Sequence, residues 1–437
     1  MKLTRLPFSP GCPPSFVLID LEFEESEDVD QSNIPWRPAH AVLLSRIFAA
    51  NTHRLRTFEI SSNIWQPIEG LASSLIDVPM PFLQSWTVMR EKAQWGREFS
   101  SDLQSDAVTR AIECAPGATP SAELSDKMYP NLRVLTLQGT YQRWAQLIPR
   151  HLVELNLKHL PRNRRPTFNQ LKVFLLGNQS TLESLTVWAP DPLRLRADQG
   201  NITLPKLKTL SLGFDSKSVS AERSLMTYLV LPRLLNLEIY DLADYNPSNI
   251  TDDADEDILS MLSWLGLDDC YWHMIEYLPL NQITKLILRS SYHELSASDR
   301  FDEACLRQRG DSVPEVPILL KFLSNCSSLK ELHLIDPNEA SLRALVTAYP
   351  ENHNNSSGLF LVCSSLDLLR IEIPRKIFPS KLDYRSLTDR KHDIVAPRRI
   401  ETVELLFYQR EDEGLWPVLS ELNRARKTVF VNEHEPF

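Results

Sequence analysis

The sequence has little glycine, with 12 in 437 residues where the average frequency of about 7% would give roughly 30. Loops that cradle phosphates need bare backbone to approach the ligand, so this shortage argues against nucleotide-binding folds. Positive charge is also short, because 47 basic residues stand against 57 acidic ones, a net charge of −10. A nucleic acid repels such a chain, and we expect no nucleic-acid partner.

Long apolar runs and paired cysteines are missing as well. The first apolar run, Phe16 to Ile19, is interrupted by Asp20 and is shorter than the roughly 7–15 residues of a secretory signal. No stretch approaches the roughly 18 apolar residues of a membrane span. The six cysteines are scattered, which favours buried thiols over a disulfide framework. These absences predict an intracellular protein, cytoplasmic or nuclear, with no membrane partner.

A short pattern, apolar-x-x-apolar-x-apolar, recurs along the chain. Residues between the apolar positions are mostly polar, an alternation that predicts strands with one buried face. Eight of twelve examples have proline within the four preceding residues, where it would end a helix before the next strand. The twelve triplets are Phe16/Ile19/Leu21, Leu55/Phe58/Ile60, Leu83/Trp86/Val88, Leu132/Leu135/Leu137, Leu152/Leu155/Leu157, Leu182/Leu185/Val187, Leu207/Leu210/Leu212, Leu234/Leu237/Ile239, Ile283/Leu286/Leu288, Leu329/Leu332/Leu334, Leu366/Leu369/Ile371 and Ile400/Val403/Leu405.

Between the triplets, apolar residues at spacings of three and four predict helices. Examples are Trp65/Ile68/Leu71/Leu75, Leu225/Tyr228/Leu229, Ile318/Leu319/Phe322/Leu323 and Leu342/Leu345/Val346. Alternation of strands and helices predicts parallel strands with helices outside. The pattern resembles an irregular leucine-rich-repeat solenoid. We therefore expect an α/β fold, a single solenoid domain over residues 1–437 with parallel strands on the concave face and helices on the convex face. Insertions are expected near residues 241–280 and 290–317. The alternative is an ordinary α/β protein whose buried strands match the pattern by chance.

Three segments resemble the repeat regions of the fungal F-box protein family. They are Cys12–Asp20, His53–Ile60 and Val78–Trp86, which are similar in residue pattern and in order to successive strand units of that family. The resemblance implies a leucine-rich-repeat region that recognises substrates for a ubiquitin ligase. The F-box itself, which opens with Leu-Pro-x-Glu, is not found in this chain, since only about ten residues precede the first strand and Leu6-Pro7-Phe8 is too short. A cullin adaptor is therefore expected as a partner only if an F-box lies upstream.

No known catalytic or cofactor motif is present. The sequence lacks a nucleophile elbow, a Walker loop, a dinucleotide fingerprint and a His-Glu-x-x-His pair, so we expect no catalytic residue and no cofactor. The nearest approach to a metal site is Asp268, Asp269, Cys270 and His273, which lacks the second close pair of a structural zinc site; packing is favoured, and no metal is expected. An acidic stretch, residues 20–30, and a basic one, residues 375–399, are interpreted as solvated loops, with docking sites as the alternative.

The strand alternation also predicts a binding surface. If the triplets point inward, the residues between and after them line the concave face, where solenoids generally bind partners. Trp188 and Tyr240 among charged neighbours match the composition of protein-binding hot spots. An ordinary solvated sheet face, with Trp188 packed on the loop at Pro190, is the alternative. The candidate residues are Glu154, Asn156, Lys158, Thr186, Trp188, Glu238, Tyr240, Arg289, His333 and Arg370.

The function expected from these observations is a non-catalytic scaffold that recognises another protein, whose identity the sequence does not give. Two alternatives stay open. One is an enzyme whose site is assembled from distant loops, since catalytic groups need no sequence proximity. The other is a standalone structural repeat protein without a specific partner.

Overall fold

The structure is a computed structural model of the chain. For some of the residues that it describes, such as those of the first and last strands, only the backbone is described. The described residues are 2–4, 15–21, 43–44, 46, 50–62, 71, 75, 78–90, 127–139, 149–160, 166, 168–188, 200–214, 225–241, 271, 273–289, 318–335, 349–350, 359–360, 365–373, 402–407 and 428–431.

The chain divides into two compact units. Unit 1 comprises Met1–Leu207, Tyr228–Pro232 and Tyr245–Asn249, and unit 2 comprises Lys208–Thr227, Arg233–Asp244 and Ile250–Phe437. Parallel strands dominate the described residues of both units, helices are few, and the sheet does not close into a barrel. The expected α/β class with a large parallel sheet is confirmed. The single solenoid domain stays a prediction.

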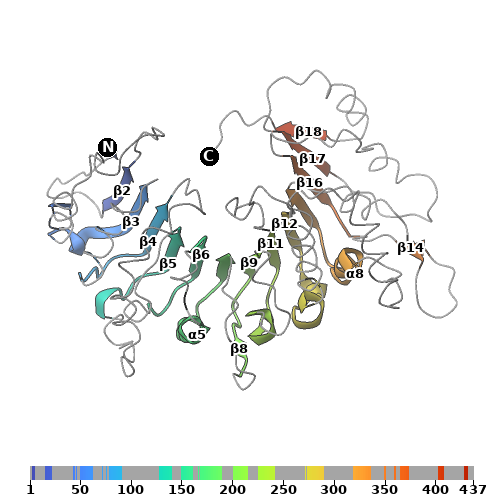
Figure 1. Cartoon of the computed structure of the whole chain (residues 1–437), viewed down its shortest axis with the longest axis horizontal. Coiled ribbons are helices and arrows are strands. Elements are labelled where there is room, and N and C mark those ends of the chain that lie inside the picture. The colour runs from blue at the N-terminus through green and yellow to red at the C-terminus, as the bar shows by residue number, and fades with distance from the viewer. Residues whose placement is uncertain are drawn as a thin grey trace, which may run out of the picture. The chain divides into compact units, whose positions relative to one another are not determined.

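Unit 1 contains seven described strands of the main sheet, in sequence order from one edge (Figure 1). All neighbours from β2 to β7 pair in parallel, whereas β1 pairs with β2 in the antiparallel sense. The strands are β1 (Lys2–Thr4), β2 (Ser15–Leu21), β3 (Leu55–Ser62), β4 (Ser85–Arg90), β5 (Val134–Gln138), β6 (Glu154–Lys158) and β7 (Ser184–Trp188).

Unit 2 also contributes seven described strands, and all their neighbouring pairs are parallel. They are β9 (Thr209–Phe214), β11 (Asn236–Asp241), β12 (Lys285–Arg289), β13 (Glu331–Ile335), β16 (Leu368–Ile373), β17 (Thr402–Phe407) and β18 (Thr428–Val431). Each of the twelve triplets therefore coincides with a strand. The two outer strands, β1 and β18, carry no triplet and were not predicted.

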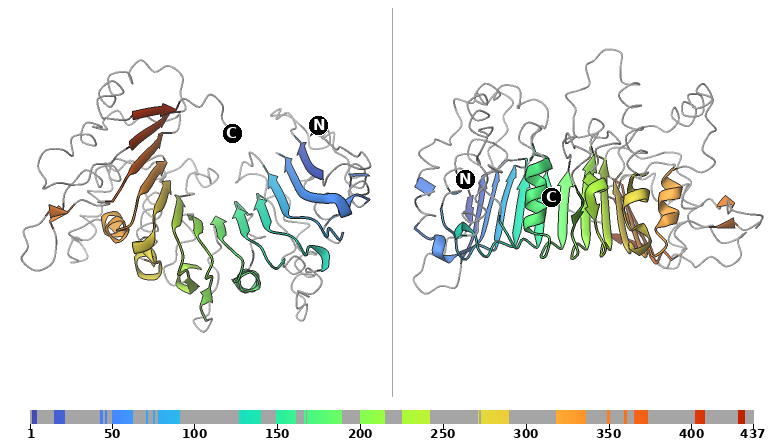
Figure 2. Two further views of the ribbon diagram at one scale, coloured as in Figure 1. Left: turned by 180° about the vertical axis from the view of Figure 1, so that it is seen from behind. Right: turned by 90° about the horizontal axis from the view of Figure 1, so that it is seen from below.

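Helices and short ladders connect these strands. Figure 2 shows α5 (Phe168–Gly177) in unit 1 and α8 (Ile318–Asn325) in unit 2, each alongside the strands of its own unit. Three 3-10 helices have defined bounds in the described residues, η2 (Thr52–Arg54), η7 (Leu225–Tyr228) and η10 (Leu280–Gln282). Two small ladders pair β8 (Ile202–Thr203) with β10 (Leu229–Val230) and β14 (Tyr349–Pro350) with β15 (Leu359–Phe360).

The structure confirms some of the predicted helices and corrects another. The helix at Ile318 is confirmed as α8, and Leu71 and Leu75 are helical and buried, whereas the one at Leu342 lies outside the described residues. The helix expected through Leu225 and Leu229 is wrong in its second half, because Leu229 opens β10. Only four residues form η7, a length typical of a 3-10 turn. Helix α5 was missed because its sequence, FNQLKVFLLG, is apolar on several sides and shows no clean stripe.

The triplets form the core of each unit. In the ten triplets whose side chains are described, no residue has more than 6% of its surface exposed. The register aligns equivalent positions, so that Leu155 pairs with Leu135 on one side and Leu185 on the other. Burying such a side chain fully contributes about 1.5–3 kcal/mol to folding, which makes this ladder the main stabilising feature. In unit 1, Trp86 adds an aromatic cluster, with ring centroids 5.4 Å from Phe58 and 5.6 Å from Tyr129.

The entry into each strand repeats the same hydrogen bonds. The acceptor is the backbone carbonyl of the residue that directly follows the first apolar residue of a triplet. It accepts hydrogen bonds from two consecutive backbone N–H groups of the next strand unit, and the first of these donors occupies the same position in its own triplet. Within unit 1, Arg133 accepts from Val153 and Glu154, and Val153 accepts from Glu183 and Ser184. Within unit 2, the acceptors are Lys208, Leu235, Thr284 and Lys330. The strand units therefore share one local geometry despite unequal spacing in sequence.

The turns after α5 and α8 are also equivalent. After α5, the buried Asn178 amide donates to the Phe174 carbonyl (2.8 Å), and after α8 the buried Cys326 thiol lies 3.5 Å from the carbonyl of Phe322. In both cases the polar group contacts the carbonyl four residues earlier, and that residue is a buried phenylalanine. Asn178 also donates to the Pro149 carbonyl (2.9 Å) and accepts from the Leu152 amide (2.7 Å), which joins the end of α5 to the start of β6.

Candidate functional site

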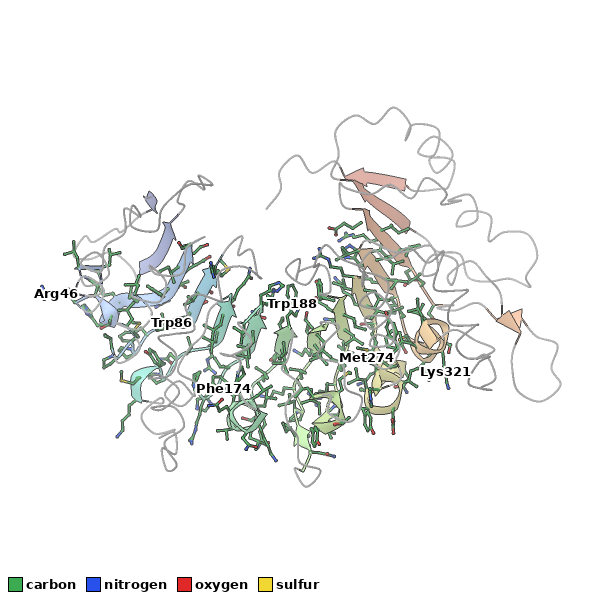
Figure 3. All side chains as sticks on the ribbon, viewed as in Figure 1. Arg46, Trp86, Phe174, Trp188, Met274 and Lys321 are labelled. Carbon is green, nitrogen blue, oxygen red and sulfur yellow. The ribbon has the colours of Figure 1, made fainter. Side chains whose placement is uncertain are left out.

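Opposite the buried triplets, each unit has a second face lined by the alternate residues of its strands. Strands β5 and β6 alternate strictly between partly exposed and buried positions, as do β11 and β12. We call these surfaces the open face of unit 1, on β3 to β7, and the open face of unit 2, on β11, β12, β13 and β16. Figure 3 shows Trp188 on one side of the unit 1 strands and Phe174, a core residue of α5, on the other.

All ten residues predicted for the binding surface lie on these faces. Glu154, Asn156, Lys158, Thr186 and Trp188 belong to unit 1, and Glu238, Tyr240, Arg289, His333 and Arg370 belong to unit 2. Nine of them are partly exposed. Thr186 is the exception, since only 7% of its surface is exposed. Placement on these faces agrees with the strand alternation, whereas a role in binding stays a prediction.

Polar side chains hold one another in place on the open face of unit 1. The register brings Thr136, Asn156 and Thr186 into one row across β5, β6 and β7. The Asn156 amide donates to the Thr136 hydroxyl (3.1 Å) and to the Glu154 carboxylate (2.6 Å). Because an amide and a hydroxyl satisfy each other here, Thr136 and Asn156 form a fixed polar pair rather than two independent side chains. Thr136 is a neighbour that sequence analysis did not include.

At the carboxyl end of β6 and β7, three side chains form what we call the Trp188 cluster: Lys158, His159 and Trp188. The Lys158 ammonium lies 4.8 Å from the centroid of the Trp188 ring, a cation–π distance. The imidazole of His159 meets the same indole edge to face, with centroids 4.9 Å apart. His159 has φ 50°, in the left-handed region that is uncommon for residues other than glycine. Sequence analysis missed His159 because a backbone conformation just beyond a strand has no signal in the residue pattern.

The open face of unit 2 carries charges around an apolar centre. In register across β11, β12, β13 and β16 lie Glu238, Ile287, His333 and Arg370 in one row, and Tyr240, Arg289, Ile335 and Glu372 in the next. Ile287 and Ile335 are partly exposed and stand diagonally between charged neighbours. The sequence analysis selected the charged residues and left these two isoleucines out, although an apolar centre with a polar rim is the usual anatomy of a protein interface.

Among the described residues of this face, a histidine–carboxylate contact and a lysine–carboxylate ion pair cross between strands. His333 Nε2 lies 3.1 Å from Glu372 Oε2, and their side chains are 17% and 20% exposed. Lys285 Nζ lies 3.5 Å from Glu331 Oε2, but both side chains are nearly half exposed, so solvent screens this pair. An imidazole held by a carboxylate is one part of general-base machinery, but here the pair equally fixes two neighbouring strands.

The candidate metal residues are not assembled by the described structure. Asp268, Asp269 and Cys270 lie outside the described residues, and His273 stacks on Tyr277 with centroids 5.9 Å apart. The neighbouring Glu276 carboxylate, mainly through a side-chain hydrogen bond, raises the pKa of Tyr277. Among the described side chains, no group of three or more His, Cys, Asp or Glu residues has the arrangement of a metal site. The acidic segment after Leu21 and the basic segment at residues 375–399 also lie outside the described residues.

Comparison with known proteins does not assign the chain to a family. No family model matches the sequence, and no curated protein is similar enough to count as a relative. In the part of the chain that the structure describes, no helix is both long and apolar enough to cross a membrane.

Proposed function

We propose that this protein is a non-catalytic recognition scaffold, a leucine-rich-repeat-like solenoid whose open faces bind another protein. The repeated hydrogen-bond pattern at the start of each strand supports the solenoid, because the equivalent carbonyl of one triplet accepts the equivalent two N–H groups of the next triplet in both units. A solenoid of this kind has its strands on the concave side and its helices on the convex side, so we expect each open face to be the concave side of its own unit.

One observation carries the binding role: an indole stands partly exposed on a polar sheet face and is held there by a cation and an imidazole. A tryptophan fixed in this way loses little conformational entropy when a partner packs on it, and tryptophan is among the residues that dominate interface energies. Tyr240 and the Ile287–Ile335 centre supply comparable anchors on unit 2.

The role resembles that of the substrate-binding region of an F-box protein. In that setting the scaffold selects the protein to be ubiquitinated, and the F-box recruits the cullin adaptor. We therefore expect association with that adaptor only where an F-box module is joined to this chain.

Affinity capture with face variants tests the proposal. The immobilised chain is exposed to cell extract, and the proteins captured by wild type, Trp188→Ala and Tyr240→Ala are compared by mass spectrometry. Phe82→Ala and Tyr277→Ala are matched controls, since Phe82 is 52% and Tyr277 39% exposed and both lie outside the open faces. We expect a protein that is lost with a face variant, retained with both controls, and bound again when purified. Equal capture by all variants, or no capture, would contradict the proposed function.

A further inference from the structure

Building on the proposed function, we propose that the Trp188 cluster takes an acidic segment of the partner protein, with an Asp or Glu carboxylate meeting Lys158 beside the indole. The cluster lies at the carboxyl end of β6 and β7, on the open face of unit 1. Three features of the described residues support an acidic partner segment. They are the charges in the surrounding row, the N–H donors of Lys158 that its contact with the indole does not use, and the fixed position of the two rings.

Among the described residues in register with Lys158, no carboxylate lies near the cluster. In register beside Lys158 lie Gln138, Met89 and Ser61, none of which is charged. The next residue in this row is Asp20, four strands from β6 and therefore about 19 Å away. The Glu154 carboxylate is four residues earlier in β6, about 13 Å along the strand, and accepts the Asn156 amide. The described residues of this row and of β6 therefore offer little repulsion to an incoming carboxylate.

Lys158 has hydrogen-bonding capacity that its contact with the indole does not use. Its ammonium lies 4.8 Å from the Trp188 centroid, and it forms no ion pair with a carboxylate among the described residues. An ammonium has three N–H donors, and an aromatic face satisfies its charge without accepting all of them. A carboxylate of a partner would complete these hydrogen bonds with a charge-assisted geometry.

The rings make the site a formed surface rather than a flexible cation. Because His159 adopts φ 50°, the chain turns after β6 in a way that keeps its imidazole edge to face with Trp188. The indole offers apolar carbon surface beside the Lys158 ammonium, which suits the aliphatic stems and carboxylates of an acidic peptide. A basic segment would be repelled by Lys158.

A charge-reversal experiment tests the inference. Binding of a fluorescein-labelled ten-residue polyglutamate peptide is measured by fluorescence anisotropy at low and at physiological salt. The variants are Lys158→Glu, Lys158→Met, which keeps the aliphatic stem, and Lys206→Glu. Lys206 is an exposed lysine of the same unit in the turn after Pro205, so its reversal changes the net charge equally without touching the cluster. Circular dichroism confirms that each variant is folded.

We expect Lys158→Glu to weaken peptide binding about 10- to 100-fold, the range for loss of a charged hydrogen bond, and Lys158→Met to weaken it less. Lys206→Glu should stay within about twofold of wild type. Three outcomes would overturn the inference. The two charge reversals could weaken peptide binding equally, or the peptide could fail to bind wild type. Inorganic phosphate at an equal concentration of charge could also displace the peptide. If the peptide does not bind wild type while Trp188→Ala still abolishes the capture of a protein, the proposed function is kept and only the inference about an acidic partner is rejected.

Discussion

Leu237 and Glu238 are adjacent in β11 but face opposite sides of the sheet. Leu237 is completely buried and in register with Leu210 and Leu286, whereas Glu238 is partly exposed on the open face of unit 2. We expect Leu237→Ala to lower the free energy of unfolding by about 2–5 kcal/mol, because it leaves a cavity. Glu238→Ala should change it by no more than about 0.5 kcal/mol. Urea denaturation measures both, and similar losses at the two positions would show that the strand faces are wrongly assigned.

Asn178 stabilises unit 1 through hydrogen bonds rather than apolar contact. Its side chain satisfies the Leu152 amide and the carbonyls of Pro149 and Phe174, all in a buried setting. Asn178→Ala removes these three hydrogen bonds from a buried setting, at about 1–3 kcal/mol for each buried group, so we expect the free energy of unfolding to fall by at least about 3 kcal/mol.

Gln179 is the matched control for this substitution. It is exposed and directly follows Asn178, so Gln179→Ala should leave the thermal midpoint nearly unchanged while Asn178→Ala lowers it clearly. A small effect of Asn178→Ala would mean that water replaces the amide and that the turn is not held by it.

At the scale of elements, His333 and Glu372 join β13 to β16. Their side chains are 3.1 Å apart and mostly buried, so their interaction is less screened than that of an exposed pair. A double-mutant cycle with His333→Ala and Glu372→Ala should give a coupling free energy of about 0.5–1.5 kcal/mol.

The pair Lys285 and Glu331 provides the comparison. Both side chains are nearly half exposed, and the same cycle there should give a coupling free energy close to zero. If the two cycles give equal coupling, burial does not decide the strength of these cross-strand pairs.

The strands of this protein were predictable from sequence because their signal is local. Each triplet marks its own strand, and period-two alternation assigns residues such as Glu154 and Lys158 to the face opposite the core. Helix α5 lacked such a signal, since Val173 and Leu176 are apolar yet 44% and 39% exposed. Strand β18 was missed for a different reason, because Thr428, which is in register with Val403, puts a polar residue at the middle position of the triplet.

The binding faces were only partly predictable, since they depend on register between distant segments. Sequence alternation places Asn156 on a face but does not reveal that Thr136, 20 residues earlier, accepts its hydrogen bond. It also does not show that Thr186 is buried. The Trp188 cluster required the positive φ of His159, which no pattern of residue types encodes.

At the scale of the whole molecule, a solenoid makes a prediction that an ordinary α/β fold does not. Each repeat of a solenoid contacts only its neighbours, so a local defect should weaken nearby strands most and distant strands least. Leu155→Ala in β6 is the informative change, because Leu155 is buried and in register with β5 and β7. Hydrogen–deuterium exchange followed by mass spectrometry should then show faster exchange in β5, β6 and β7, a smaller effect in β4, and the least in β3. A uniform increase across these strands would indicate that unit 1 opens as one cooperative block, and the solenoid proposal would have to be abandoned for this unit.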